Sequence, residues 1–199
     1  MKKIVIHDYA GHPFQTSLSN ELARFGHEVV HAYFAQDEGP KGKMTSTVFK
    51  FFPISIKSEY SKKNFIARRF GDIEYGKEVA KLIKDFKPNV ILSGNTPTEA
   101  QEIIIKSSKK NGAAFIYWCQ DFYSIAANII LKRKIPLLGS LIGSYYSFLE
   151  KRQMKQADHI ILITKGFLEQ TKKWKIDKNK VSIIENWGPL DEIELFPKD

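Results

Sequence analysis

Short apolar runs alternate with longer stretches of helical periodicity along most of the chain. The runs are centred near residues 4, 29, 49, 91, 115, 160 and 182. Runs this short, bounded by turn residues, are typical of buried strands, and the stretches between them repeat apolar residues every three or four positions, as amphipathic helices do. The alternation predicts an α/β fold with a Rossmann-like, doubly wound and mostly parallel sheet of about seven strands.

The first unit of this pattern lies within the first 34 residues. A strand at residues 3–7 is followed by a helix from about residue 16 to residue 25, and a second strand follows Gly26. Such a βαβ unit has a right-handed crossover. Its first loop, DYAGHPFQ, contains Gly11 but no G-x-G-x-x-G. The absence of this dinucleotide fingerprint argues against a bound NAD.

The pattern continues to residue 187. Strands are predicted at 47–54, 89–94, 159–164 and 180–187, and helices at 62–86, 97–110 and 165–175. The last twelve residues, GPLDEIELFPKD, contain two prolines and four acids and match no further element. We therefore expect a domain over 1–187 and a linker over 188–199 that leads towards a second domain.

The central stretch is AAFIYWCQDFYS, residues 113–124. Its uncharged part, 113–118, is typical of a strand that is covered on both faces. Ligands of open parallel sheets lie beyond the carboxyl ends of the strands, so Asp121 is a candidate for contact with a substrate. Asn95 and Thr96 follow the preceding strand and are candidates on the same ground. The alternative for all three side chains is that they cap the following helices.

Residues 122–157 are basic and apolar. Six basic residues stand against one acid, Glu150, and fifteen uncharged residues lie between Lys134 and Glu150. A helix over them places four apolar residues on one face: Leu138, Ile142, Tyr145 and Leu149. This pattern indicates a segment that lies on an anionic membrane surface. A core helix with solvated basic ends is the alternative.

Composition narrows the choice of partners. The net charge of +9 favours an anionic partner, such as a membrane, a phosphate group or nucleic acid. Nucleic acid is not expected, because the basic residues are scattered and match no known binding motif. The chain shows neither a signal-peptide core nor a window apolar enough to span a bilayer. The single cysteine, Cys119, cannot form an internal disulfide, which favours a cytoplasmic setting, and a buried core role is favoured over a catalytic thiol.

Several segments together carry a family resemblance. They are LARFGHEV (22–29), KPNVILSG (87–94), WCQD (118–121), EKRQMKQADHIILITKGF (150–167) and KVSIIENWGP (180–189). In this order they resemble the amino-terminal domain of a retaining GT-B glycosyltransferase, of the branch that builds bacterial capsule, O-antigen and other exopolysaccharides. The resemblance covers about residues 3 to 190, and the segments from WCQD onwards are its more specific part.

The resemblance implies a hexosyltransferase-type activity that is shared between two domains. The amino-terminal domain holds the acceptor, and a second domain binds the nucleotide sugar through two glutamates eight positions apart. No two glutamates of this chain have that spacing. We therefore expect the acceptor-binding half of an enzyme, inactive alone, with no cofactor or metal. A non-catalytic, membrane-anchoring subunit that recruits a separate catalytic chain is the alternative.

The resemblance also implies roles for single residues. Gly11 would let the backbone approach the donor phosphates, and His12 would donate a hydrogen bond to a phosphate or to the sugar. Asp121 would orient hydroxyl groups or support positive charge at the reacting sugar carbon. Three side chains would bind acceptor hydroxyls: Asn95, Thr96 and Gln120.

Acceptors in this branch are commonly carried on a polyprenyl diphosphate in the membrane. The resemblance thus implies a peripheral protein on the inner face of the cell membrane. Headgroups or the acceptor diphosphate would meet Lys132, Arg133 and Lys134. The apolar interface would receive Leu137, Leu138, Leu141 and Ile142. Each basic residue near anionic lipid contributes about 1 kcal/mol, so the cluster acts collectively.

Overall fold

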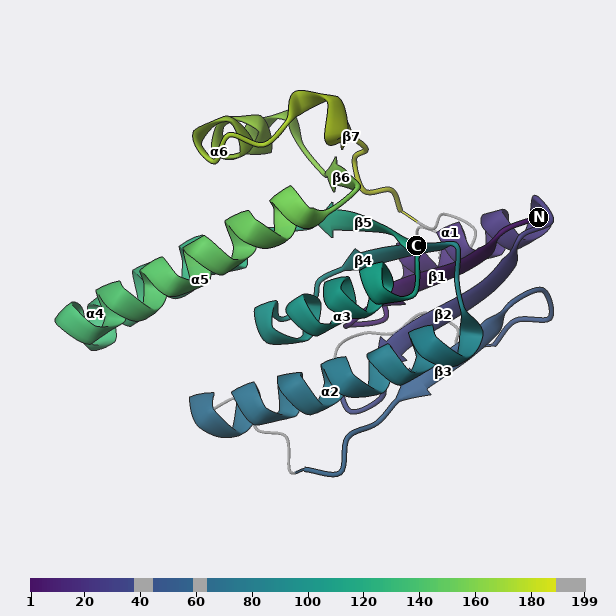
Figure 1. The fold of residues 1–199 in the computed structure, drawn as a ribbon, viewed down its shortest axis with the longest axis horizontal. Coiled ribbons are helices and arrows are strands. Elements are labelled where there is room, and N and C mark those ends of the chain that lie inside the picture. The colour runs from purple at the N-terminus through teal and green to yellow at the C-terminus, as the bar shows by residue number, and fades with distance from the viewer. Residues whose placement is uncertain (38–44, 59–63, 189–199) are drawn as a thin grey trace, which may run out of the picture.

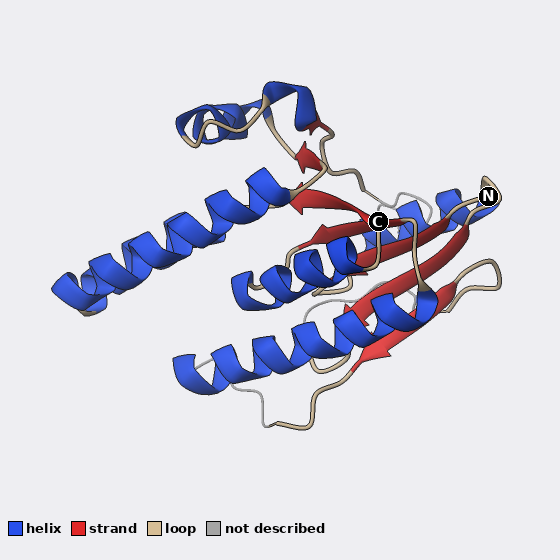
Figure 2. Cartoon of the chain, in the orientation of Figure 1, coloured by secondary structure: helices blue, strands red, loops and turns tan. Residues whose placement is uncertain are grey.

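The computed structural model describes residues 1–37, 45–58 and 64–188. This part of the chain forms one parallel sheet with helices on both faces (Figures 1 and 2). The strands are β1 Lys3–Asp8, β2 Glu28–Phe34, β3 Lys50–Ile54, β4 Val90–Gly94, β5 Ala114–Cys119, β6 His159–Leu162 and β7 Val181–Ile183. The helices are α1 Pro13–Arg24, α2 Phe65–Phe86, α3 Thr98–Lys110, α4 Tyr123–Lys134, α5 Pro136–Gln156 and α6 Leu168–Lys173, with 3-10 turns η1 Lys165–Phe167 and η2 Lys178–Lys180.

The strand order is β3-β2-β1-β4-β5-β6-β7, and every neighbouring pair is parallel. The predicted doubly wound α/β sheet is thus confirmed. From β1 the chain winds outward to β3, and from β4 it winds the other way to β7. The connections after β1 and β4 therefore diverge to opposite faces, which opens a crevice at the carboxyl edge between these two strands.

Two hydrophobic clusters lie on the two faces of the sheet. On the face of α2, α3 and α5, the fully buried Tyr75, Ile104 and Met154 belong to one cluster. On the opposite face, Phe14 and Leu18 of α1 pack against the second cluster. Burial on both faces explains why the strands are apolar runs rather than alternating ones.

Gly76 lies in the middle of α2, where a glycine weakens a helix by about 1 kcal/mol relative to alanine. The helix nevertheless continues through it without a break. A Cβ atom at Gly76 would lie 2.8 Å from the Cα atom of Ala100 in α3. The glycine therefore allows α2 and α3 to approach closely.

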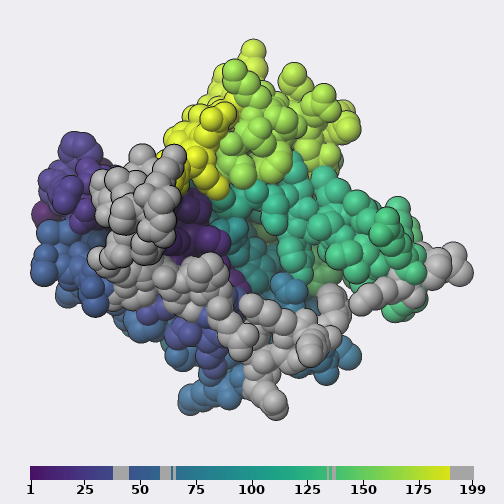
Figure 3. Space-filling model, turned by 180° about the vertical axis from the view of Figure 1, so that it is seen from behind, coloured from purple at the N-terminus to yellow at the C-terminus, as the bar shows by residue number. Residues whose placement is uncertain are grey.

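Helices α4 and α5 form a hairpin that projects beyond the sheet (Figure 1), and it also projects at the right-hand edge in the view from behind (Figure 3). Two glycines of α5 let the helices approach each other. A Cβ atom at Gly139 would lie 2.1 Å from the carbonyl oxygen of Leu131, and one at Gly143 would lie 2.2 Å from Oδ1 of Asn128. The uncharged stretch of the sequence is therefore one arm of a helical hairpin.

Several boundaries differ from those predicted. Helix α1 begins at Pro13, three residues early, because proline suits the first turn, where its missing N–H has no intrahelical partner. The helix predicted over 165–175 is a 3-10 turn followed by a shorter helix, and the last strand ends at Ile183, having only the short β6 as its partner. Strand β3 begins at Lys50 instead of residue 47. From residue 189 onwards the predicted linker lies outside the described residues.

Candidate functional site

The crevice at the carboxyl edge contains a cleft with a volume of about 110 Å³. Its lining residues come from the ends of three strands and from four helices: Tyr9, Arg68, Asn95, Thr96, Pro97, Gln101, Tyr117, Trp118, Gln120, Asp121, Tyr123 and Glu150. The four side chains that sequence analysis placed at strand ends, Asn95, Thr96, Gln120 and Asp121, therefore share one cleft. They do so because parallel strands end at the same edge.

The loop after β1 is organised by Asp8, which sequence analysis did not single out. Its buried carboxyl group accepts hydrogen bonds from the backbone N–H groups of Ala10, at 3.3 Å, and of His12. Gly11 sits between them at φ 77°, a conformation that glycine adopts without strain. An acid close behind an apolar run was the available signal, and it is the same signal that identified Asp121.

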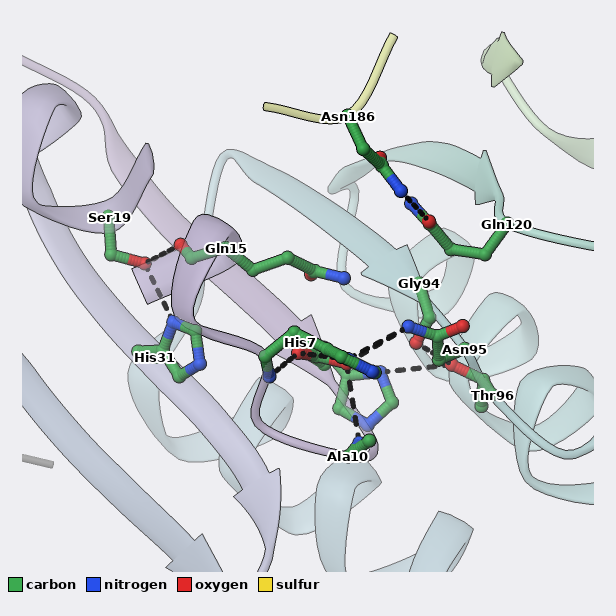
Figure 4. A network of polar contacts seen from close by, with 12 residues as sticks. His7, Ala10, Gln15, Ser19, His31, Gly94, Asn95, Thr96, Gln120 and Asn186 are labelled. Carbon is green, nitrogen blue, oxygen red and sulfur yellow. Dashed lines mark hydrogen bonds and ion pairs between the residues drawn. The ribbon is translucent and has the colours of Figure 1, made fainter. Parts of the chain in front are cut away.

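His12 lies on this loop but, like Gly11, is not among the residues that line the cleft. Its Nδ1 lies 3.1 Å from Oδ2 of Asp8, and this hydrogen bond raises the pKa of His12. Asn95 reaches the same carboxyl group, with its Nδ2 3.4 Å from Oδ1 of Asp8. Asn95 has φ 51°, a left-handed conformation that asparagine tolerates better than most residues. The ends of β1 and β4 are thus joined by one polar cluster (Figure 4).

A buried network supports this cluster from below. His7 is fully buried, with Nδ1 2.8 Å from Oγ of Ser93 and Nε2 2.7 Å from the hydroxyl of Tyr75. Burial lowers the pKa of His7 to about 4, so the ring is neutral, with one nitrogen donating and the other accepting. Ser93 also donates to Gln101 at 2.8 Å and lies 2.9 Å from Oγ1 of Thr96. The Thr96 hydroxyl is therefore held at the cleft by the sheet beneath it.

Gln15 is a second residue that sequence analysis missed. Its side chain is fully buried, and neither polar atom of its amide has a hydrogen-bond partner among the described residues. A Cβ atom at Gly94 would lie 3.0 Å from Nε2 of Gln15, so the amide packs against the end of β4. Unpaired buried amides are rare and indicate a water or ligand partner.

The helix-capping alternatives for the strand-end residues are wrong. Phe122 is the N-cap of α4 and Pro97 is the N-cap of α3, and neither helix receives a capping hydrogen bond from its N-cap side chain. Asp121 is exposed as a residue, but its carboxyl group is partly shielded from water, and this loss of hydration raises its pKa. Beside it, Oε1 of Gln120 accepts a hydrogen bond from Asn186 at 2.7 Å (Figure 4). Asp121 is thus presented to the cleft rather than to its own helix.

Helix α2 supplies the opposite wall of the cleft. The hydroxyl of Tyr9 donates to Oδ1 of Asp72 at 3.2 Å, and Nε of Arg68 lies 3.7 Å from Oδ2 of the same residue. Burial raises the pKa of Asp72 to about 7. The guanidinium group of Arg68 also lies 5.6 Å from the ring centre of Tyr123. A cation is therefore fixed at this wall, at a position that no sequence pattern marks.

Large apolar side chains are exposed along the hairpin, where Lys132 and Arg133 are exposed too. We call these apolar residues the hairpin patch: Ile129, Ile130, Ile135, Leu138, Leu141, Tyr145 and Phe148. The predicted face is partly wrong, because Leu149 is buried and Ile142 is half-buried, whereas Leu141 and Phe148 are exposed. The side chains of Lys134 and Leu137 lie outside the described residues.

Three other possibilities are a metal site, a catalytic thiol and a membrane-spanning helix. No cluster of three or more potential metal ligands occurs in the described ranges. Cys119 is buried, burial raises the pKa of its thiol, and its Sγ donates to the carbonyl oxygen of Asp121 at 3.2 Å. These features favour a structural role for this residue. Among the helices that the structure describes, none has the length and apolar character to cross a membrane.

The chain matches the model of one protein family and superposes on several solved structures. The model of Glycosyltransferase Family 4 matches residues 15–191. Sucrose-phosphate synthase from Thermosynechococcus elongatus superposes with a TM-score of 0.62 at 10% identity, over 93% of this chain and 48% of that one. Anabaena Alr3699/HepE in complex with UDP and glucose gives 0.55 at 12% identity, over 96% and 46%.

A plant protein shares the same fold. Glycyrrhiza uralensis UGT73P12, complexed with glycyrrhetinic acid 3-O-monoglucuronide, gives a TM-score of 0.57 at 10% identity, over 96% of this chain and 49% of that one. Identities this low establish the fold alone. The chain spans about half the length of these structures. No curated protein matches the chain.

Proposed function

The chain belongs to glycosyltransferase family 4, and from this premise we propose that it is the acceptor-binding half of a retaining glycosyltransferase. The enzyme would move a sugar from a nucleotide-sugar donor to a saccharide acceptor. The observation that carries this proposal is the meeting of Asn95, Thr96, Gln120 and Asp121 in one cleft at the carboxyl edge. A second domain of similar fold, in the same or another chain, would bind the donor nucleotide across this cleft.

The donor phosphates would approach the loop that contains Gly11 and His12. The hydrogen bond that His12 donates to Asp8 favours the protonated form of His12, which would place a cation beside the phosphates. The amino end of α1 begins directly after His12, and its helix dipole also favours an anion there. Both effects would stabilise the negative charge that develops on the leaving diphosphate.

Asp121 would act at the reacting sugar. In a retaining transfer of this kind the leaving phosphate accepts the proton of the attacking hydroxyl group, so no separate general base is required. The Asp121 carboxylate would orient hydroxyl groups and support the positive charge that develops at the sugar carbon. The acceptor hydroxyls would be bound by Asn95, Thr96 and Gln120. Thr96 is suited to this role, because the buried network holds its hydroxyl in place.

The hairpin patch supports a lipid-linked acceptor in bacterial surface polysaccharide synthesis. Its exposed apolar side chains lie next to the exposed Lys132 and Arg133, which is the combination that an anionic bilayer attracts. The hairpin starts at the cleft, since Tyr123 of α4 and Glu150 of α5 both line it. A hairpin docked on the inner membrane face would bring a polyprenyl-diphosphate acceptor to the cleft.

Transfer of a radiolabelled sugar tests this function. The full-length protein is incubated with a panel of nucleotide sugars and with vesicles that contain polyprenyl-diphosphate-linked saccharides. Label that enters the lipid fraction would support the proposal. Label that enters only water-soluble acceptors would contradict the lipid-linked acceptor, and transfer that requires a separate catalytic chain would favour a membrane-anchoring subunit.

A further inference from the structure

Glu150 is a buried carboxyl group that the proposed chemistry does not use. It lies on α5, is 1% exposed, and is the only acid among the basic and apolar residues of the hairpin. It also lines the cleft together with Asp121. A buried carboxyl group is costly unless hydrogen bonds compensate for the lost hydration, so its partners indicate what it does.

The partners of Glu150 are at the start of α4. The hydroxyl of Ser124 donates to Oε2 of Glu150 at 2.6 Å, and the backbone N–H of Ser124 donates to the same oxygen at 3.2 Å. The first N–H groups of a helix have no intrahelical partner, and the N-cap of α4, Phe122, offers no side-chain acceptor. Glu150 thus supplies from α5 the cap that α4 lacks in its own sequence.

This cap fixes the segment that carries Asp121. On one side of that segment, the thiol of Cys119 donates to the carbonyl oxygen of Asp121 at 3.2 Å. On the other side, Ser124 is bound to Glu150. The close contacts at Gly139 and Gly143 hold α4 against α5, and Gly143 and Glu150 lie two helical turns apart on the same helix. Asp121 therefore lies between two anchored points.

The electrostatic surroundings make this cap sensitive to pH. The pKa of Glu150 is raised to about 7, because burial, with the charge of Asp121 added, raises it more than the hydrogen bonds from Ser124 lower it. The titratable groups that face Glu150 are Tyr117 and Cys119 of β5 and Asp121 of the following loop. The other charged group that lines the cleft is Arg68 of α2, on the opposite wall.

We propose that Glu150 is a positioning residue, which caps α4 and thereby holds the Asp121 loop in the cleft. The inference rests on the proposed function where it assigns Asp121 a role at the reacting sugar. The capping itself is independent of any activity. One measurement therefore tests the cap itself, and a second tests its effect on sugar transfer.

Hydrogen exchange of the full-length protein tests the cap. In Glu150→Ala, the amides of residues 123–126 should exchange at least tenfold faster, whereas those of β5 should be unchanged. Glu150→Gln should retain the protection, because its amide oxygen accepts the same N–H bond. Unchanged exchange at 123–126 in Glu150→Ala would overturn the proposal. If that variant does not fold, Ser124→Ala is measured in its place. The amides of residues 123–126 should then exchange at least threefold faster than in the wild type. Exchange at the wild-type rate would contradict the cap.

Kinetics in the sugar-transfer assay test the consequence. Glu150→Ala should lower kcat at least tenfold and leave the KM for the donor within twofold, while Glu150→Gln should restore kcat to within threefold and flatten its dependence on pH near 7. A loss of kcat that Glu150→Gln does not restore would overturn the positioning role. Faster exchange in Glu150→Ala combined with unchanged kinetics in Asp121→Ala would leave the cap intact and refute only the proposed function of the cleft.

Discussion

Asp8 and His12 form a pair at the end of β1, with Nδ1 of His12 3.1 Å from the buried carboxyl oxygen Oδ2 of Asp8. The same carboxyl group accepts a hydrogen bond from the backbone N–H of His12, so it both positions this residue and raises the pKa of its side chain. The pairing thus orients His12 and favours its protonated form at the end of β1.

Removal of this acid should change how donor binding depends on pH. In Asp8→Asn the hydrogen bond that raises the pKa of His12 is weakened, so His12 loses its proton at a lower pH. The alkaline limb of kcat/KM for the donor should therefore move to lower pH, with a loss of at least fivefold at pH 8. His12→Gln should show no such limb. The check is a pH profile of sugar transfer, and an unshifted limb in Asp8→Asn would contradict the pairing.

His7 should make the folded state sensitive to acid. Its pKa is lowered to about 4 in the folded protein from about 6.5, so the unfolded chain binds a proton more readily. This residue's contribution to the free energy of unfolding is complete above pH 6.5 and is lost as the pH falls towards 4. The loss is on the order of 3 kcal/mol.

The variant His7→Gln isolates this contribution. It should be less stable than wild type at pH 7, because a hydrogen bond to Tyr75 or Ser93 is disturbed, but it should lose less stability between pH 6.5 and pH 4. Urea unfolding of both proteins at several pH values provides the measurement. Parallel stability profiles would show that His7 does not titrate as its burial requires.

The stability of the protein should depend on the two glycines of the hairpin. In Gly143→Ala the new methyl group meets Asn128, and in Gly139→Ala it meets the backbone of Leu131, so α4 must move away from α5. Overpacking of this kind costs about 1 to 3 kcal/mol, so each change should lower the midpoint of thermal unfolding. Ser144→Ala, at an exposed position of α5, serves as the control. Glycine variants as stable as the control would contradict the close packing.

Binding to anionic vesicles should depend on the basic residues of the hairpin. The combined change of Lys132, Arg133 and Lys134 to Glu should weaken sedimentation with anionic vesicles at least tenfold, since each lysine or arginine near such a surface contributes about 1 kcal/mol. The control carries the same charge change at the opposite edge of the sheet, on exposed residues: Lys84, Lys109 and Lys110. If both triple variants bind alike, net charge rather than the hairpin explains the binding.

The apolar part of the hairpin patch needs its own variant. Leu141→Ser with Phe148→Ser removes two exposed apolar side chains without a change of charge. It should weaken binding to anionic vesicles and leave the salt dependence of the remaining binding unchanged. Wild-type affinity in this variant would indicate that the protein binds the surface by charge alone.

The strand ends could be predicted from the sequence because they follow from a simple rule. Buried parallel strands are mostly apolar, so the polar residues that follow each run mark the carboxyl edge. Parallel order then brings Asn95, Thr96 and Asp121 to the same edge although they are distant in sequence. The fold class and the strand-end residues of the cleft could therefore be predicted without coordinates.

The helical contributions to the cleft could not be predicted in this way. Arg68 and Glu150 reach the cleft because of how their helices rotate against the sheet, and charged residues within long helices are common at any position. The fifteen uncharged residues of the hairpin contain no charge to mark the solvent side. Hence Leu149 was placed on the exposed face, although packing against the core buries it.

The most direct test of the account is the turnover of the full-length protein with Asp121 changed to Asn. This variant preserves the shape of the side chain and removes its negative charge. The account predicts at least a tenfold loss of kcat in sugar transfer, with an unchanged unfolding midpoint and unchanged exchange of the amides at 123–126. Turnover equal to that of the wild type would contradict the assignment of this cleft as the site of transfer.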